Sequence, residues 1–192
     1  MSTGTPQERV IEAALTLIAD NGLSAVTMAE VARTAGVARA TLYNHFPDVP
    51  SIVAVAARQH NEHAIAGVRQ AVAVAGSAAD TIEQLVRYVA AISSHGHSLE
   101  TQQGFPPQLR QQLAAFDDEL ENQIKGALLG GVAQGDFRSD LNLATAATLI
   151  RHMLNGLSEL VAATPANAPQ LVGETNQTVL AAIMGPGPNG KS

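Results

Sequence analysis

Residues 27–46, TMAEVARTAGVARATLYNHF, hold the pattern that decides the fold. They read as two short helices joined by a turn that contains Gly36. Ala32 is small enough to let the second helix approach the first, and a glycine at position 36 can take the positive φ that closes a tight turn. Other apolar residues fall where two crossed helices must touch, namely Val31, Val37 and Leu42. The spacing therefore predicts a helix-turn-helix unit.

The second helix of this unit is expected to expose one face. Successive helical residues lie about 100° apart, so one side would carry Arg39, Ala40, Tyr43 and Asn44, and the other Ala38, Leu42 and His45. Arginine can pair with guanine and asparagine with adenine, an alanine can meet the thymine methyl, and a tyrosine hydroxyl can donate to a phosphate. Thr27, the expected cap of the first helix, can direct its hydroxyl and nearby amides at a phosphate. The residues expected to contact DNA are Thr27, Arg39, Ala40, Thr41, Tyr43, Asn44 and His45.

Simpler interpretations exist for three of these side chains. Tyr43 could be a half-buried packing residue, and Arg39 a solvated surface arginine. His45 is expected to pack at the helix junction rather than to read bases, although its imidazole could donate to a phosphate.

Residues 7–52 resemble the N-terminal DNA-binding domain of the tetracycline-repressor (TetR) family of transcriptional regulators. The shared features are a helix that ends in Asn21-Gly22, a helix start at Thr27, AGV at 35–37 and TLYNHF at 41–46. The resemblance implies an all-helical homodimer. Its larger C-terminal domain would dimerise through the last two long helices and would bind a small molecule, and this binding would release the DNA. It also implies that Tyr43 touches the DNA backbone, and that Phe46 packs the DNA-reading helix onto the long helix that follows.

Two positions differ from the usual pattern of the family. Ala38 replaces the Ser or Thr that commonly caps the recognition helix, a cap typically worth about 1 kcal/mol. Val49 stands where a basic residue commonly binds phosphate. The net charge of the chain is −6, and residues 1–50 hold three arginines against five carboxylates, a net charge of −2. Contact with DNA must therefore be local, with modest affinity and a shallow dependence on salt.

The remaining sequence predicts further helices and an all-α fold. Capping boxes are expected at Thr5 with Glu8, at Thr27 with Glu30 and at Asp80 with Glu83. The expected helices cover 7–20, the two of the central motif, about 49–76, 81–94, 106–116, 117–134, 141–163 and a last segment that ends at Met184, about nine in total. Residues 95–105 are expected to form a loop. The expected organisation is a DNA-binding domain at 1–47, a ligand-binding and dimerisation domain at 48–184 and a disordered tail at 185–192.

Composition limits the class of protein. Of the 192 residues, 46% are hydrophobic and 15% are charged, as in folded proteins, and there is no cysteine. No apolar run approaches the roughly 18 to 20 residues of a membrane span, and residues 1–10 lack the features of a secretory signal. We expect a soluble cytoplasmic protein without a membrane partner.

A ligand pocket is expected among the helices at 50–75, 81–94, 106–116 and 117–134. Few aromatic residues are available, so a small or aliphatic ligand fits better than a large planar cation. The aromatic and leucine candidates each also have an ordinary core interpretation. The candidates are His63, Tyr88, His97, Phe105, Phe116, Leu120 and His152.

Histidines outside the motif raise the question of a metal. His60 and His63 lie one helical turn apart beside Glu62, and a loop holding His95 and His97 could complete a site. Exposed histidines explain the pattern about as well. The sequence therefore predicts neither a bound metal nor a cofactor.

The helix expected at 141–163 carries a candidate dimer interface. Gly156 lies among apolar residues and allows a partner helix to approach, although the same residues could pack within one chain. With the last helix and the symmetry mates it would complete a four-helix interface. Two recognition helices would then reach major grooves about 34–36 Å apart on a roughly palindromic operator. The candidates are Leu149, Met153, Gly156, Leu157, Leu160, Val179 and Ile183.

The sequence as a whole favours a ligand-responsive transcription factor, a homodimer that represses by binding a double-stranded DNA operator and is released by an unidentified small molecule. An activator would have the same sequence features. The alternative is a helical metal- or ligand-binding protein, possibly hydrolytic, in which the DNA module is vestigial. No nucleophile, base and orienting group form a recognisable triad, so an enzyme is disfavoured.

Overall fold

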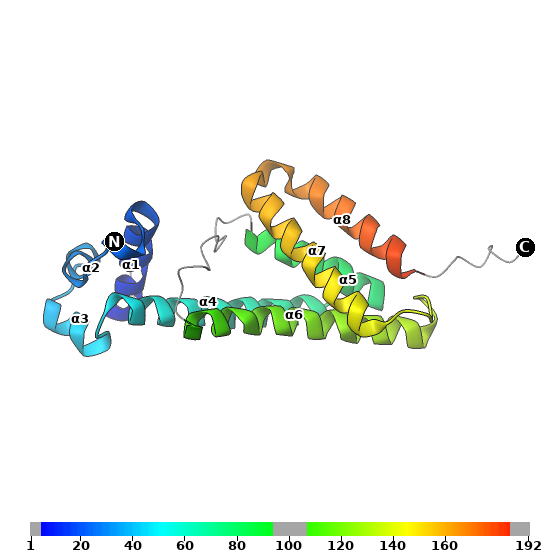
Figure 1. The fold of residues 1–192 in the computed structure, drawn as a ribbon, viewed down its shortest axis with the longest axis horizontal. Coiled ribbons are helices and arrows are strands. Elements are labelled where there is room, and N and C mark those ends of the chain that lie inside the picture. Colours follow the sequence, from blue (N-terminus) through cyan, green and yellow to red (C-terminus); the bar gives the residue numbers. More distant parts are fainter. Residues whose placement is uncertain (1–4, 94–106, 185–192) are drawn as a thin grey trace, which may run out of the picture. The chain divides into compact units, whose positions relative to one another are not determined.

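The computed structural model describes residues 5–93 and 107–184, and these form eight α-helices (Figure 1). Short 3₁₀ helices, η1 (Leu23–Ala25) and η3 (Pro165–Asn167), precede α2 and α8. The described residues contain only one isolated β-bridge, between Phe137 and Met184. The predicted all-α class is confirmed. The helices are α1 (Pro6–Asn21), α2 (Met28–Ala35), α3 (Arg39–His45), α4 (Val49–Ala73), α5 (Ala78–Ser93), α6 (Pro107–Gln134), α7 (Leu143–Ala163) and α8 (Ala168–Ile183).

The described residues divide into two compact units. The first contains the chain up to Asn61 and the start of α6 up to Leu113. The second contains the rest of α4 and α6 together with α5, α7 and α8. Among these helices, none combines the length and apolarity that a bilayer span requires.

Local capping signals fix the first helices as predicted. Glu8 N–H donates to Thr5 Oγ1 at 3.3 Å, and Thr5 N–H donates to the Glu8 carboxylate at 2.7 Å. Thr27 and Glu30 form the same reciprocal pair at the start of α2. Each pair satisfies two backbone amides, counting the capping residue's own, near a helix end.

The third expected capping box is wrong by three residues. Helix α5 begins at Ala78, and Asp80 N–H donates to Ser77 Oγ at 3.1 Å. The Asp80 carboxylate reaches back to the Gly76 N–H at 2.8 Å. Ser77 can cap as well as an aspartate, and Ala78 and Ala79 are strong helix formers. Asp80 therefore belongs to the first turn of α5.

The helices expected at 106–116 and 117–134 are one helix, α6, so the chain has one helix fewer than predicted within the described residues. The boundary expected between 116 and 117 is wrong, because no glycine or proline lies between Pro107 and Gly126. Ala114 and Ala115 precede this boundary and favour an unbroken helix. The Asp117 carboxylate lies 3.7 Å from the Arg151 guanidinium of α7.

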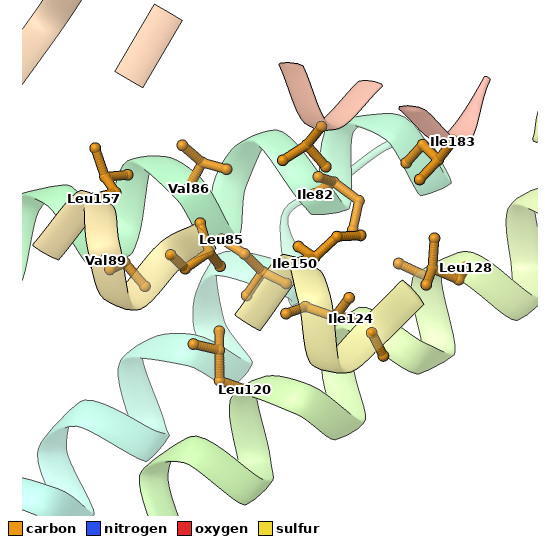
Figure 2. Packing of buried hydrophobic residues seen from close by; sticks show 14 of the residues in the cluster. Ile82, Leu85, Val86, Val89, Leu120, Ile124, Leu128, Ile150, Leu157 and Ile183 are labelled. Carbon is orange, nitrogen blue, oxygen red and sulfur yellow. The ribbon is translucent and has the colours of Figure 1, made fainter. Parts of the chain in front are cut away.

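An aliphatic core holds the second unit together (Figure 2). Helices α5, α7 and α8 pack on one another, and α6 adds its buried face. Complete burial of one such side chain contributes about 1.5–3 kcal/mol. The residues labelled in Figure 2 are Ile82, Leu85, Val86 and Val89 of α5, Leu120, Ile124 and Leu128 of α6, Ile150 and Leu157 of α7, and Ile183 of α8.

Residues 95–105, expected to be a loop, and the expected tail at 185–192 lie outside the described residues.

Candidate nucleic-acid interface

The turn of the helix-turn-helix unit has the geometry that the sequence predicts. Gly36 adopts φ 63° and ψ 38°, the left-handed conformation, and follows directly after α2. Val37 N–H donates to Ala32 O at 3.0 Å and closes the turn. A Cβ on Gly36 would have no described atom within 4 Å. The glycine is therefore required by backbone conformation rather than by space.

Buried side chains lock α3 against α1 and α2. Leu42 and Val31 are completely buried, and Ala32 is nearly so. They belong to one cluster with residues of α1 and with Phe46, Ile52 and Ala56. The orientation of the short helix α3 is therefore set by its packing, which leaves its opposite face in solvent.

The exposed face of α3 carries the predicted side chains. Arg39, Ala40 and Asn44 are exposed, and Tyr43 keeps 56% of its surface. Thr41 is half-buried. The alternative that Tyr43 is a packing residue is wrong, because more than half of its surface remains exposed.

His45 and Phe46, the last two residues of TLYNHF, have opposite surroundings. Phe46 is 2% exposed and packs in the core of the first unit, as the family resemblance implied. His45 is exposed, although its ring lies 6.4 Å from that of Phe46. The expectation that His45 packs at the junction is therefore wrong, because α3 ends at this residue. The pair presents one polar ring to solvent and one apolar ring to the core.

The ends of α2 and α3 differ in how they are capped. The Thr27 hydroxyl accepts from Glu30 N–H at 3.3 Å and lies 2.7 Å from Glu30 Oε2, to which it donates. The hydrogen bonds that the Thr27 hydroxyl and N–H donate to the Glu30 carboxylate lower its pKa and favour its charged form. At α3 the cap is Ala38, which has no polar side-chain atom to offer. Val49 is buried at the start of α4, so it is a packing position here.

An open concavity of about 390 Å³ lies beside the recognition face. Its walls come from α2, the turn and the first residue of α3. Sequence reasoning missed Ala29 and Arg33 as parts of this surface, although their i, i+4 spacing puts them on one side of α2. The lining residues are Ala29, Glu30, Ala32, Arg33, Val37 and Arg39.

Residues 10–48, which contain this whole unit, match the family of bacterial regulatory proteins, tetR family. The chain carries the DNA-binding domain of the TetR family. It is a DNA-binding regulator of transcription.

Relatives and solved structures extend the likeness beyond the first domain. The HTH-type transcriptional repressor KstR2 of Rhodococcus jostii is 29% identical over 148 residues, which cover 74% of this chain and 72% of KstR2. The fatty acid degradation regulator FadR from Bacillus halodurans has a TM-score of 0.77 at 20% identity, over 94% of this chain and 97% of FadR. FadR from Bacillus subtilis, solved in complex with stearoyl-CoA, has a TM-score of 0.68 at 23% identity, over 91% and 95% of the two chains. These relatives regulate transcription, and the expectation that the chain is not an enzyme is confirmed by their class.

The expected ligand residues of this TetR-family chain fall into three groups. Tyr88, Phe116 and Leu120 lie in or against the core of the second unit. His63 and His152 are exposed. His97 and Phe105 lie outside the described residues. The structure therefore places the aromatic and leucine candidates in or against one core cluster and leaves the two histidines exposed.

Tyr88 makes a defined contact with α4. Its hydroxyl donates to Ala64 O at 3.0 Å, and its ring fills the space where a Cβ of Gly67 would lie. Burial raises the pKa of the Tyr88 hydroxyl. Helices α4 and α5 approach closely at this point.

A polar cluster between α6 and α7 was not foreseen from the TetR-family pattern. Arg151 Nε donates to Glu121 at 2.7 Å, and Thr148 Oγ1 donates to the same carboxylate at 2.9 Å. These bonds lower the pKa of Glu121. Burial raises the pKa of Asp117, against the opposing effect of Arg151. The surroundings of the Arg151 guanidinium therefore favour the neutral form of Asp117 and the charged form of Glu121.

The expected dimer residues of the TetR-family domain divide between surface and core. Leu149, Met153 and Leu160 on α7 keep 60%, 37% and 55% of their surface, and Gly156 is half-buried between them. Leu157, Val179 and Ile183 are buried within their own chain, so their assignment to a partner-facing surface is wrong. A helix with apolar residues on two sides can use one for its core and leave the other for a partner.

Within residues 5–93 and 107–184, no group of three or more metal-binding side chains is placed to hold an ion. His95 and His97 of the hypothetical histidine site lie outside the described residues.

Proposed function

We propose that this TetR-family regulator is a homodimeric repressor that binds a roughly palindromic DNA operator and is released by a small molecule. The observation that carries the proposal is the exposed face of α3, held in place by the buried Leu42. A short helix that is held by packing against α1 and α2, and that exposes arginine, asparagine and tyrosine, is suited to the major groove.

The exposed side chains have distinct roles in this proposal. Arg39 pairs with guanine and Asn44 with adenine, and both therefore select bases. Ala40 and Thr41 line the same side of the groove. Tyr43, Thr27 and His45 contact the phosphate backbone and set the position of the helix on the duplex.

The test is to select duplexes bound by the protein from a random pool. We expect an enriched inverted repeat with half-sites one helical turn apart. Arg39→Ala should weaken binding to the selected duplex by about 1–3 kcal/mol and relax preference at one base step. Arg87→Ala, an equal change of charge on α5, is the matched control and should leave binding unchanged. A pool without an enriched motif would contradict the proposal.

The proposed dimer uses the apolar strip of α7, defined as Leu149, Met153, Gly156 and Leu160. These positions follow the i, i+4, i+7, i+11 spacing of one helix face. Three exposed large apolar side chains in one row are typical of a partner-binding surface. In this organisation residues 1–47 bind DNA, residues 48–184 bind the ligand and dimerise, and 185–192 form the tail.

The proposed ligand is a small or aliphatic molecule bound by the second domain, near Tyr88, Phe116 and Leu120. The Bacillus subtilis FadR complex with stearoyl-CoA supports an aliphatic ligand. Stearoyl-CoA is therefore the first probe. A ligand that binds better to the conformer with separated recognition helices shifts the population away from DNA by that difference in affinity.

A further inference from the structure

Arg33 was given no role by the sequence, yet the structure places it beside the recognition helix. It is exposed on α2 and lines the same concavity as Arg39, the first residue of α3. Ala29, one turn earlier on α2, is also exposed and adds only a methyl group to the wall. The concavity therefore has an arginine from each helix of the motif.

We infer that Arg33 binds a phosphate of the DNA backbone while Arg39 reaches the bases. The inference rests on the proposed function. In a helix-turn-helix unit the second helix enters the major groove, and the first helix crosses the sugar-phosphate backbone. A guanidinium on the exposed side of the first helix, next to the start of the second, is placed where that backbone passes. Arginine suits this position because its fork of donors matches phosphate oxygens.

Both arginines are available for an external anion. In the described part of the chain, neither Arg33 nor Arg39 has an ion-pair partner. Glu30 is the acidic residue of the same concavity, and its carboxylate turns back to Thr27, with Oε2 3.0 Å from the backbone nitrogen and 2.7 Å from the hydroxyl. Glu30 thus caps α2 but leaves its charge near Arg33, which weakens the attraction of this surface for phosphate.

A structural role for Arg33 predicts a different result. Arg33 lies in the last turn of α2, where a cation favours the helix dipole. Loss of that interaction would lower the stability of the protein but would not change how DNA binding depends on salt. The salt dependence therefore separates the two roles.

The size of the expected effect follows from counterion release. Each neutralised phosphate contributes about 0.9 to the slope of log affinity against log salt. A dimer holds two copies of Arg33, so removal of the side chain should lower the slope by about 1.8. The loss of affinity should consequently shrink about three- to fourfold each time the salt concentration doubles.

The experiment measures binding at several salt concentrations to the selected duplex, to a single-mismatch duplex and to an unselected duplex. Arg33→Ala should weaken all three by a similar factor and lower the salt slope, and Arg33→Lys should keep most of the slope. Arg39→Ala should instead reduce the difference between the duplexes. Arg87→Ala is the control for a positive charge lost from a helix outside the motif.

Glu30→Gln tests the same surface in the opposite direction. Glutamine can keep the capping pair with Thr27 while it removes the negative charge beside Arg33. We expect tighter binding to all three duplexes and a small loss of thermal stability, because glutamine gives up the favourable negative charge in the first turn of α2. This variant also keeps the inference testable should Arg33→Ala fold poorly.

The possible failures are distinguishable. If wild-type protein enriches no duplex, the proposed function itself fails. If wild-type protein binds a selected duplex and Arg39→Ala loses preference, but Arg33→Ala keeps the wild-type affinity and slope, the inference about Arg33 is overturned and the proposed function stands. A change of base preference in Arg33→Ala would also overturn the phosphate assignment.

Discussion

Gly131 and Gly130 are neighbours on α6 that differ in what surrounds them. The Phe137 ring occupies the space where a Cβ of Gly131 would lie. Gly131 O also accepts from the N–H groups of Asp136 and Phe137, at 2.9 Å and 3.1 Å. The chain thus folds back closely over the end of α6, and a side chain at position 131 would obstruct it.

Gly131→Ala should destabilise the protein, because the Phe137 ring must leave its place or the end of α6 must move. Overpacking of this kind typically costs about 1–3 kcal/mol. Gly130→Ala is the control, since its Cβ would meet no described atom within 4 Å and alanine favours a helix. Urea unfolding should give Gly130→Ala a higher free energy of unfolding than wild type, and Gly131→Ala a lower one. Equal stability of the two variants would show that Phe137 yields without cost.

Asp117 and Glu121 predict opposite responses to substitution and pH. Burial raises the pKa of Asp117 above its ordinary 3.8, so folding is favoured at low pH and loses that contribution as pH rises through the folded-state pKa. Hydrogen bonds lower the pKa of Glu121 below 4.5, so its contribution is present above 4.5 and is lost as pH falls through the folded-state pKa.

Asp117→Asn should therefore raise the melting temperature at pH 7, and Glu121→Gln should lower it. Both differences should shrink on acidification, because the wild-type carboxyls become neutral like their replacements. Thermal unfolding between pH 3 and pH 7 measures this. A change of melting temperature in the same direction for both variants at pH 7 would contradict the opposing environments of Asp117 and Glu121.

Helix α3 begins without a side-chain cap. Ala38 has the extended backbone of a capping residue, with φ −66° and ψ 144°, but lacks a side-chain acceptor. Ala38→Ser should supply one and stabilise the protein by about 0.5–2 kcal/mol. Ala40→Ser, two residues into the same helix, is the matched control and should give no gain. The measurement is thermal unfolding of the two variants. Equal melting temperatures for Ala38→Ser and Ala40→Ser would refute a capping effect.

Much of the element order was predictable because its signals are local. Caps at Thr5 and Thr27, and the turn at Gly36, depend on residues within one helical turn. The start of α5 was misplaced because Ser77 and Asp80 are both good caps, and packing decides between them. The break expected between 116 and 117 does not exist, because residues on both sides of it favour a helix and no glycine or proline ends one there.

The candidate site was predictable only where a single helix determines it. The exposed face of α3 follows from its own periodicity, with Leu42 as the buried reference. Arg33 was missed because its closeness to Arg39 depends on how α2 and α3 cross. Leu157 and Leu160 are close in sequence, yet only the packing of α5, α7 and α8 shows which one is covered.

For the whole molecule, the proposed dimer predicts an effect of charge on the strip of α7. Leu149→Asp combined with Leu160→Asp should give a folded monomer with much weaker operator binding, because a buried charge opposes association. Leu129→Asp, on an equally exposed leucine of α6, is the control and should remain a dimer. Light scattering at micromolar concentration and circular dichroism measure the two properties. A wild-type monomer under these conditions would contradict the proposed assembly.

The charge of the whole chain predicts how DNA binding responds to salt. With three arginines against five carboxylates in residues 1–50, few phosphates can be neutralised. We expect a shallow slope, since each neutralised phosphate contributes about 0.9. Titrations of the selected duplex at several salt concentrations measure it. A steep slope would reveal phosphate contacts from residues outside those named.

The modest size of the apolar strip on α7 has a consequence for copy number. Its three large side chains form a small contact surface, so the proposed dimer should dissociate at low protein concentration. Below the dissociation constant of the dimer, the dimer concentration varies with the square of the total protein concentration, so a twofold dilution as a cell doubles its volume lowers the dimer concentration to about a quarter. Operator occupancy would then respond steeply to the balance between synthesis of the regulator and growth of the cell, even before any inducer arrives.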